Sequence, residues 1–354
     1  MARRTVTVRP HALALGATIA IALTACSRGG DAPRAGSGPG GGDATPGGGA
    51  SADGGAVALP DGAAPSEDGG KPRSDGGPDP VFASKLYVLP QTPFAVTKIG
   101  DAVEALLAAT PSLAHVIVFV HGRACGGGGE PGKSLGSVVP ELESDYAAGV
   151  VMFHWPGSDD GCPLGFPEDQ ARAAGPALRT MVERLDEHLA THPATRAKIK
   201  LALLTHSMGN IVLEAALASK TGLAPAVFAT AILNSSATAA AGHAPWLARL
   251  DFATNVYVTV NSGDNVLLAA GAGRGARLGR DLGTETLTAR AAYVDFSAAN
   301  VNHQYYVSSG QKGAHMRDFY RDALQGRVYD LAGSTAITKR TVRDGATVYT
   351  FDGK

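Results

Sequence analysis

The sequence predicts a doubly wound α/β domain built on a mostly parallel sheet with helices on both faces, and three observations carry this prediction. Short β-branched segments alternate with helical segments along residues 81–354, as expected when crossover helices join parallel strands. The segment Ala114–Val120 is a continuous β-branched run, which is typical of a strand covered on both faces. Polar residues follow several strands, at the edge where open α/β sheets place their active crevices.

Strands and helices alternate through the first half of this domain. Each predicted strand is a short apolar run, and each predicted helix has apolar residues at helical spacing. The strands are Lys85–Leu89, Ala114–Val120 and Gly149–Phe153, and the helices are Asp101–Ala109 and Asp169–Leu189. The dipeptide Gly175-Pro176 either kinks the second helix or marks its true start.

Strands and helices also alternate through the second half of the domain, which ends in a predicted hairpin. A strand that begins near Lys198 runs into a turn at Ser207, and a helix is predicted over Ile211–Lys220. The later elements are strands at Ala226–Leu233, Asn255–Val260 and Ala291–Phe296 and a helix at His315–Leu324. Alternating Val, Thr and Tyr around Asp344-Gly345 predict a closing hairpin within residues 327–354.

The amino terminus reads as an export signal followed by a linker. Three arginines precede the apolar run Ala12–Leu23, which is too short for a convincing membrane span. The run ends in Leu23-Thr24-Ala25-Cys26, which resembles the lipobox of bacterial lipoproteins. That resemblance implies that residues 1–25 are removed and that Cys26 carries lipid. The alternative is an ordinary secretory signal with an incidental cysteine.

The linker, residues 26–80, is predicted to be a disordered tether. Gly and Pro supply 25 of the 54 residues from Ser27 to Pro80, and large apolar side chains are almost absent. A lipid-anchored chain with this tether is expected in a bacterial cell envelope. Ser27, rather than an aspartate, favours the outer membrane by the sorting rule of lipoproteins in general.

Charge and cysteine content limit which partners and metal sites are expected. A net charge of −1 and 18% charged residues give no reason to expect a nucleic-acid partner. Cys125 and Cys162 are most simply a disulfide, because an even pair in an exported domain usually pairs and each follows a predicted strand. Metal binding is not expected, since no Cys-x-x-Cys or His pair at ligand spacing accompanies them.

Ser207 is the candidate nucleophile. It stands in Thr205-His206-Ser207-Met208-Gly209-Asn210, between an apolar strand and a helix, where the helix N-terminus points its N–H groups at the serine. The backbone N–H of Met208 would then meet a developing oxyanion. Thr205 occupies a position where glycine is more usual. The alternative is an ordinary strand followed by a serine-capped helix.

The acid and base follow in the order Ser…Asp…His. A serine nucleophile needs a base, and a carboxylate must orient that base and stabilise its charged form. Asp264 comes just past a predicted strand and is preferred over Asp251 and Asp295. His303 follows the last core strand and is preferred over His315.

A second oxyanion donor is expected in the turn His121-Gly122-Arg123, which follows the strand Ala114–Val120. The backbone N–H of Arg123 is the preferred donor, paired with that of Met208. His121 is expected to brace the loop, and His206 is interpreted as structural.

Together these residues resemble the α/β-hydrolase superfamily of serine esterases and lipases. The resemblance covers about residues 114–318 and is carried by His121-Gly122, the turn Phe153-His154-Trp155-Pro156-Gly157, the Ser207 motif, Asp264 and His303. The turn and the Ser207 motif look most like a bacterial group of uncharacterised α/β hydrolases. The resemblance implies an acyl-serine intermediate, no cofactor, and hydrolysis of a small-molecule ester, thioester or lipid.

The sequence therefore predicts a lipid-anchored, exported serine hydrolase acting on carboxylic esters. One alternative is a non-catalytic envelope lipoprotein that uses the hydrolase scaffold for binding. The intact Ser…Asp…His order speaks against that alternative. A third reading is a peptidase or acyltransferase with the same three residues, because fold analogy cannot separate these activities.

Overall fold

The computed structural model describes residues 84–89, 93–123, 134–157, 166–218, 223 and 225–352, all within one compact unit, 75–354. The predicted export signal, the tether and the three cysteines lie outside the described residues.

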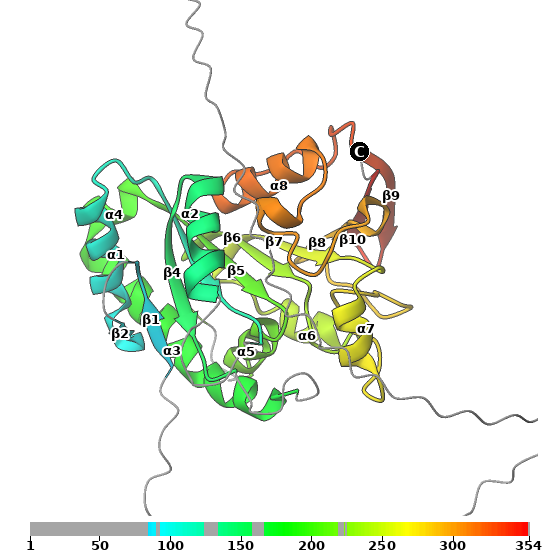
Figure 1. Ribbon diagram of the computed structural model, residues 1–354, viewed down its shortest axis with the longest axis horizontal. Helices are drawn as coiled ribbons and strands as arrows, with labels where there is room; N and C mark the ends of the chain where they lie inside the picture. Colours follow the sequence, from blue (N-terminus) through cyan, green and yellow to red (C-terminus); the bar gives the residue numbers. More distant parts are fainter. Residues whose placement is uncertain are drawn as a thin grey trace, which may run out of the picture. The chain divides into compact units, whose positions relative to one another are not determined.

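The domain is built on a ten-stranded, mostly parallel sheet, which is the predicted fold class (Figure 1). The strands lie in the order β2-β1-β4-β3-β5-β6-β7-β8-β10-β9, so that the hairpin β9–β10 ends the sheet opposite β1 and β2. Neighbours from β4 to β10 pair in parallel, and β1, β2 and β9 pair antiparallel to their neighbours. The strands are β1 Lys85–Tyr87, β2 Phe94–Ala95, β3 His115–Val120, β4 Gly149–His154, β5 Lys200–His206, β6 Phe228–Asn234, β7 Ala253–Val260, β8 Ala292–Asp295, β9 Ile337–Arg343 and β10 Ala346–Phe351.

Helices cover both faces of the sheet and create two apolar cores. The helices are α1 Ile99–Ala109, α2 Val139–Tyr146, α3 Glu168–Thr191, α4 Pro193–Lys198, α5 Gly209–Ala216, α6 His243–Leu247, α7 Asn265–Gly271 and α8 Ala314–Leu324, with short helical turns at 96–98, 134–138, 297–299 and 308–310. Helices α1, α3, α5 and α6 share one core, and α2 and α8 share the other.

Strand β3 shows how the sequence builds these two cores. Alternate side chains of a strand point to opposite faces. Val116, Val118 and Val120 belong to the core shared with α3, while Ile117 and Phe119 belong to the core shared with α8. All five are fully buried, which accounts for the continuous apolar run in this strand.

Several boundaries differ from the sequence prediction. Helix α3 runs from Glu168 through Gly175-Pro176 without ending there, so the dipeptide does not mark its start. Helix α5 begins at Gly209 and ends at Ala216, four residues before the predicted end, where Leu217 N–H bonds to both Leu213 O and Glu214 O. Such a shared bond is typical of a tightening last turn.

The last two strands form a hairpin, and the type of its turn explains the register in which the two strands pair. Asp344 and Gly345 have φ of 53° and 77°, the left-handed pair of a type I′ turn. The antiparallel partners of the hairpin include Ala346 and Arg343 on either side of this turn. Strand β10 then pairs in parallel with β8, so the tail extends the sheet.

Among the described residues, no helix combines the length and apolar character needed to cross a bilayer.

Candidate active site

Ser207 lies in a strained turn between β5 and α5. Its φ is 52°, a conformation that costs a non-glycine residue free energy and is found at functional turns. The backbone of the strand next to it holds the turn, because Ser207 N–H donates to Asn234 O at 3.0 Å. Ala237 N–H donates to Ser207 O at 3.1 Å on the other side. A serine in a tight turn between a strand and a helix is the geometry that a nucleophile turn requires.

A buried side-chain clamp stabilises this turn. The hydroxyl of Thr205 donates to Asn210 Oδ1 at 2.7 Å, and both residues are fully buried. Asn210 Nδ2 donates to Ser207 O at 3.0 Å and to Asn234 O at 3.2 Å. Thr205 therefore stabilises the turn by a hydrogen bond at a position where glycine is more usual. Sequence analysis did not single out Asn210, although it follows Ser207 by one helical turn.

His303 and Asp264 meet beside the turn. His303 Nδ1–H donates to Asp264 Oδ2 at 2.7 Å. The other carboxylate oxygen of Asp264 accepts from Leu267 N–H at 3.0 Å, as the N-cap of α7. Asp264 is 1% exposed, so both of its oxygens are fixed away from bulk water. The carboxylate thus orients the His303 ring so that Nε2 faces away from it.

The other candidate acids and base have different surroundings. Asp251 precedes β7, and its carbonyl accepts from Ala226 N–H at the amino-end edge of the sheet. Asp295 Oδ1 accepts from the N–H and the hydroxyl of Ser297, at 2.9 and 2.5 Å. His315 lies in the first turn of α8. The structure brings only Asp264 to a candidate histidine among these described residues.

His206 and Ser235 hold the backbone of His303. His206 Nε2–H donates to His303 O at 3.2 Å, and Ser235 Oγ–H donates to the same oxygen at 3.0 Å. The rings of His206 and His303 have centroids 4.7 Å apart. Burial lowers the pKa of His206 well below its usual value, with the nearby His303 a second cause, so His206 stays neutral. Its structural interpretation therefore extends to positioning His303.

The loop after β3 lies directly against the Ser207 turn, and two glycines permit the approach. A Cβ at Gly122 would stand 2.9 Å from Ser207 Cβ, and one at Gly209 would stand 2.5 Å from Val120 O. Arg123 follows Gly122, so its backbone is next to Ser207. Met208 is the N-cap of α5, and N–H groups at a helix start have no intrahelical acceptor.

His121 braces this loop. Its Nδ1–H donates to Gly122 O at 2.5 Å, and its Nε2 accepts from Trp155 N–H at 3.2 Å. Trp155 Nε1–H donates in turn to His121 O at 2.8 Å. Burial, and then the neighbouring His154, lower the pKa of His121 to about 3, so the ring stays neutral.

A cavity of about 440 Å³ opens beside Ser207, within the size range of small-ligand pockets. Its described lining combines Ser207 and Met208 with one side of α7, an aromatic ring and two arginines. These residues are Arg123, Phe166, Ser207, Met208, Asn265, Val266, Leu267, Ala269, Ala270 and Arg274. Helix α7, which sequence analysis missed, thus forms a wall of the site.

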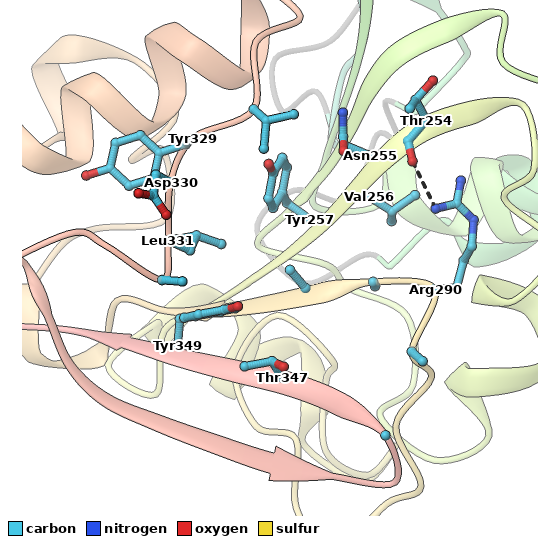
Figure 2. Close-up of a pocket in the computed structure, with 16 residues that line it drawn as sticks. Thr254, Asn255, Val256, Tyr257, Arg290, Tyr329, Asp330, Leu331, Thr347 and Tyr349 are labelled. Atoms are coloured by element: carbon cyan, nitrogen blue, oxygen red, sulfur yellow. Dashed lines mark hydrogen bonds between the residues drawn. The ribbon is translucent and has the colours of Figure 1, made fainter.

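A larger hollow, of about 650 Å³, lies at the opposite edge of the sheet (Figure 2). It is lined where β7, β8 and β10 begin, and Tyr257, Tyr329 and Tyr349 are among its side chains. Arg290 at its edge donates to Thr254 O at 3.3 Å. None of the predicted site residues lines it. Size alone therefore does not select the candidate site, because Ser207 lines the smaller cavity.

No group of three or more His, Cys, Asp or Glu side chains that could hold a metal ion occurs among the described residues.

Comparisons with known proteins give only distant likenesses. No protein-family model matches the sequence, and no curated protein matches it. Among solved structures, it is similar to an esterase from the hyperthermophilic archaeon Pyrobaculum calidifontis, at 15% identity and a TM-score of 0.32, over 60% of this chain and 75% of that one. It is also similar to a cold-adapted esterase from an Arctic intertidal metagenomic library, at 16% identity and a TM-score of 0.36, over 62% and 86% of the two chains.

A carboxyl esterase from the fungus Tuber melanosporum gives a similar result, with 16% identity, a TM-score of 0.32, and 60% and 80% of the chains covered. At such low identities and scores, these likenesses transfer neither a substrate nor a residue role to this chain. The chain's own topology is more informative. Its mostly parallel sheet, with Ser207 after β5, Asp264 after β7 and His303 after β8, has the arrangement of the α/β-hydrolase fold.

Proposed function

We propose that this chain is a serine hydrolase that cleaves carboxylic esters or thioesters through an acyl-serine intermediate. The observation that carries the proposal is the combination of three features around the Ser207 turn. Ser207 stands in a strained turn at the cavity, the N-terminus of α5 adjoins it, and His303 donates to the buried Asp264 at 2.7 Å. No single one of these features would support the reaction alone.

In the proposed acylation step, Ser207 Oγ attacks the ester carbonyl carbon while His303 Nε2 takes the hydroxyl proton. The charged ring is stabilised by Asp264, to which Nδ1–H already donates. The N–H groups of Met208 and Arg123 donate to the oxyanion. The tetrahedral intermediate then collapses, and His303 gives its proton to the leaving alcohol or thiol.

Deacylation repeats these steps with water in place of the serine. His303 accepts a proton from water, and the resulting hydroxide attacks the acyl carbon. Collapse of the second tetrahedral intermediate releases the carboxylic acid, and the proton held by His303 returns to Ser207 Oγ.

The test is hydrolysis of p-nitrophenyl esters of several acyl lengths by the full chain in mild detergent. Ser207→Ala is expected to lower kcat by at least ~1,000-fold, because the nucleophile is lost. Ser309→Ala, at an exposed serine that does not line the cavity, should leave turnover unchanged. Absence of both ester turnover and fluorophosphonate labelling at Ser207 would favour the binding scaffold. Faster amide than ester turnover would favour a peptidase.

We also propose that Cys26 anchors the chain by lipid in the bacterial outer membrane, on the strength of the lipobox-like Leu23-Thr24-Ala25-Cys26. Cys26→Ser should move the protein from the membrane to the soluble envelope fraction, and mass spectrometry should find no acylated N-terminal peptide. Ser27→Asp should keep the lipid but shift the protein to the inner membrane. A Cys26→Ser chain that stays membrane-bound would contradict the anchor.

The pairing of Cys125 with Cys162 is likewise a proposal. Maleimide labelling of the unfolded protein, with and without reductant, tests it.

A further inference from the structure

One wall of the cavity beside Ser207 carries concentrated positive charge. The Arg274 guanidinium lies 5.0 Å from the centroid of the Phe166 ring, and the Arg277 guanidinium lies 4.9 Å from the same centroid. Both distances are within the range of cation–π contacts. Arg274 and Phe166 line the cavity together with the apolar side of α7.

The hydrogen bonds of the Arg277 guanidinium go to uncharged backbone carbonyls. Arg277 is 4% exposed and donates to Ala270 O at 3.0 and 3.2 Å and to Ala237 O at 3.1 Å. These carbonyls satisfy its donors but do not neutralise its charge. Burial lowers the pKa of Arg277, Glu168 opposes that shift, and the charge of Arg274 adds to it.

Few carboxylates offset this charge. Glu168 is the carboxylate that acts on Arg277, and it is already shared with Arg172 at 2.8 Å. Arg274 forms no ion pair with any carboxylate of the described residues, and its side chain is exposed. The described cavity lining contains no Asp or Glu. An anionic ligand group would therefore gain attraction here without displacing an existing partner.

We propose that the substrate of this site is an ester bearing an anionic group, a carboxylate or a phosphate, which Arg274 binds while the apolar side of α7 holds the hydrocarbon part. A planar guanidinium suits either group because it donates two parallel hydrogen bonds. The ring of Phe166 holds the Arg274 guanidinium at the cavity wall. This inference rests on the proposed hydrolase function and narrows its substrate.

The experiment compares two matched pairs of esters with the full chain. In the first pair, p-nitrophenyl adipate carries a terminal carboxylate and p-nitrophenyl hexanoate does not. In the second, 1-acyl lysophosphatidate carries a phosphate and the 1-monoacylglycerol of the same chain length does not. The variants are Arg274→Gln and, as a matched loss of charge, Arg317→Gln, an exposed arginine on α8 that lines none of the cavities described above.

We expect kcat/KM to favour the anionic member of at least one pair by about tenfold, the scale of a charge-assisted hydrogen bond. Preference in the first pair identifies a free carboxylate ester, and preference in the second identifies a phospholipid. Arg274→Gln should remove the preference, and Arg317→Gln should keep it. Raising the ionic strength should weaken it. Equal or reversed preference in both pairs, or a preference that survives Arg274→Gln, overturns the inference.

A binding measurement separates this inference from the proposed reaction. In the Ser207→Ala background, adipate or glycerol 3-phosphate should raise Tm, and adding Arg274→Gln should abolish the rise. If neither anion raises Tm in an Arg274-dependent way, the inference fails even where esters are hydrolysed. If the rise is present but no ester is turned over, the anion site stands and the proposed hydrolase function fails.

Discussion

At the residue scale, the hydroxyl of Thr205 helps to hold the Ser207 turn in place. It donates to Asn210 Oδ1, while the amide of Asn210 donates to the carbonyls of Ser207 and Asn234. The two side chains thus join the end of β5, the turn and the end of β6. Ser207 is held at φ 52° by this arrangement, which offsets the conformational cost of the turn.

Thr205→Val keeps the side-chain shape but removes the hydroxyl. Asn210 Oδ1 would lose its 2.7 Å donor inside a fully buried site, so we expect a loss of ~1–3 kcal/mol in the free energy of unfolding. We also expect a lower kcat with little change in KM, because the serine is less firmly held. Urea unfolding and steady-state kinetics measure the two effects. Thr205→Ser, which keeps the donor, should lose less of both; equal losses would refute the clamp.

The sequence identified candidate residues for the site but not the residues that position them. The type and position of Ser207, Asp264 and His303 are visible because each follows a strand. The contacts of His206 and Ser235 with the carbonyl of His303 are invisible in sequence, since they join residues 97 and 68 positions apart. Only the folded chain brings those atoms within hydrogen-bond distance.

At the scale of elements, helices α3 and α5 pack closely through Gly175. A Cβ at this position would stand 2.5 Å from Ala215 Cβ and 2.7 Å from the Ala215 carbonyl carbon. This contact gives Gly175 a packing role on the helix that backs α5. Because α5 begins at the Ser207 turn, its packing on α3 also fixes the turn.

Gly175→Ala should therefore force α5 away from α3. We expect a loss of ~1–3 kcal/mol in the free energy of unfolding, the usual cost of overpacking, which outweighs the better helix propensity of alanine. Chemical denaturation measures it. Gly136→Ala is the matched control, because nothing lies within 4 Å of a Cβ there. A Gly175→Ala protein as stable as the control would contradict the close packing.

Two helices that the sequence did not predict are short. Helices α2 and α7 have 8 and 7 residues, too few for a clear periodic pattern. Helix α7 is capped by Asp264, a residue singled out for its carboxylate alone. One side chain serves both as N-cap and as partner of His303, and only the geometry of the folded chain reveals this.

At the scale of the whole molecule, buried neutral histidines make stability depend on pH. Burial lowers the pKa of His121 to about 3 and that of His206 well below 6.5. Below about pH 6.5 these histidines bind protons in the unfolded chain but not in the folded chain, so the free energy of unfolding should fall as the pH falls. The slope contributed by each histidine is ~1.4 kcal/mol per pH unit.

Urea unfolding at a pH of about 7, 6 and 5 measures this dependence. His121→Asn removes one of the two groups, so its curve should be shallower by about one proton below pH ~6 even though the variant is less stable overall. Carboxylates contribute equally to both proteins and cancel in the difference. Parallel curves for the variant and the parent protein would show that His121 is not held neutral by the fold.

The sequence by itself determined the fold class, the order of the long strands and helices, and the types of residue at the carboxyl ends of the strands. These features follow from local sequence patterns. Runs of β-branched residues, helical spacing and the Asp344-Gly345 turn can each be recognised from residues that are close together in the sequence. The tertiary structure decided which polar side chains meet. The pairing of His303 with Asp264, the clamp around Ser207 and the two arginines on Phe166 each join separate elements. Such contacts depend on how the helices and loops pack around the sheet, and no local pattern encodes that packing.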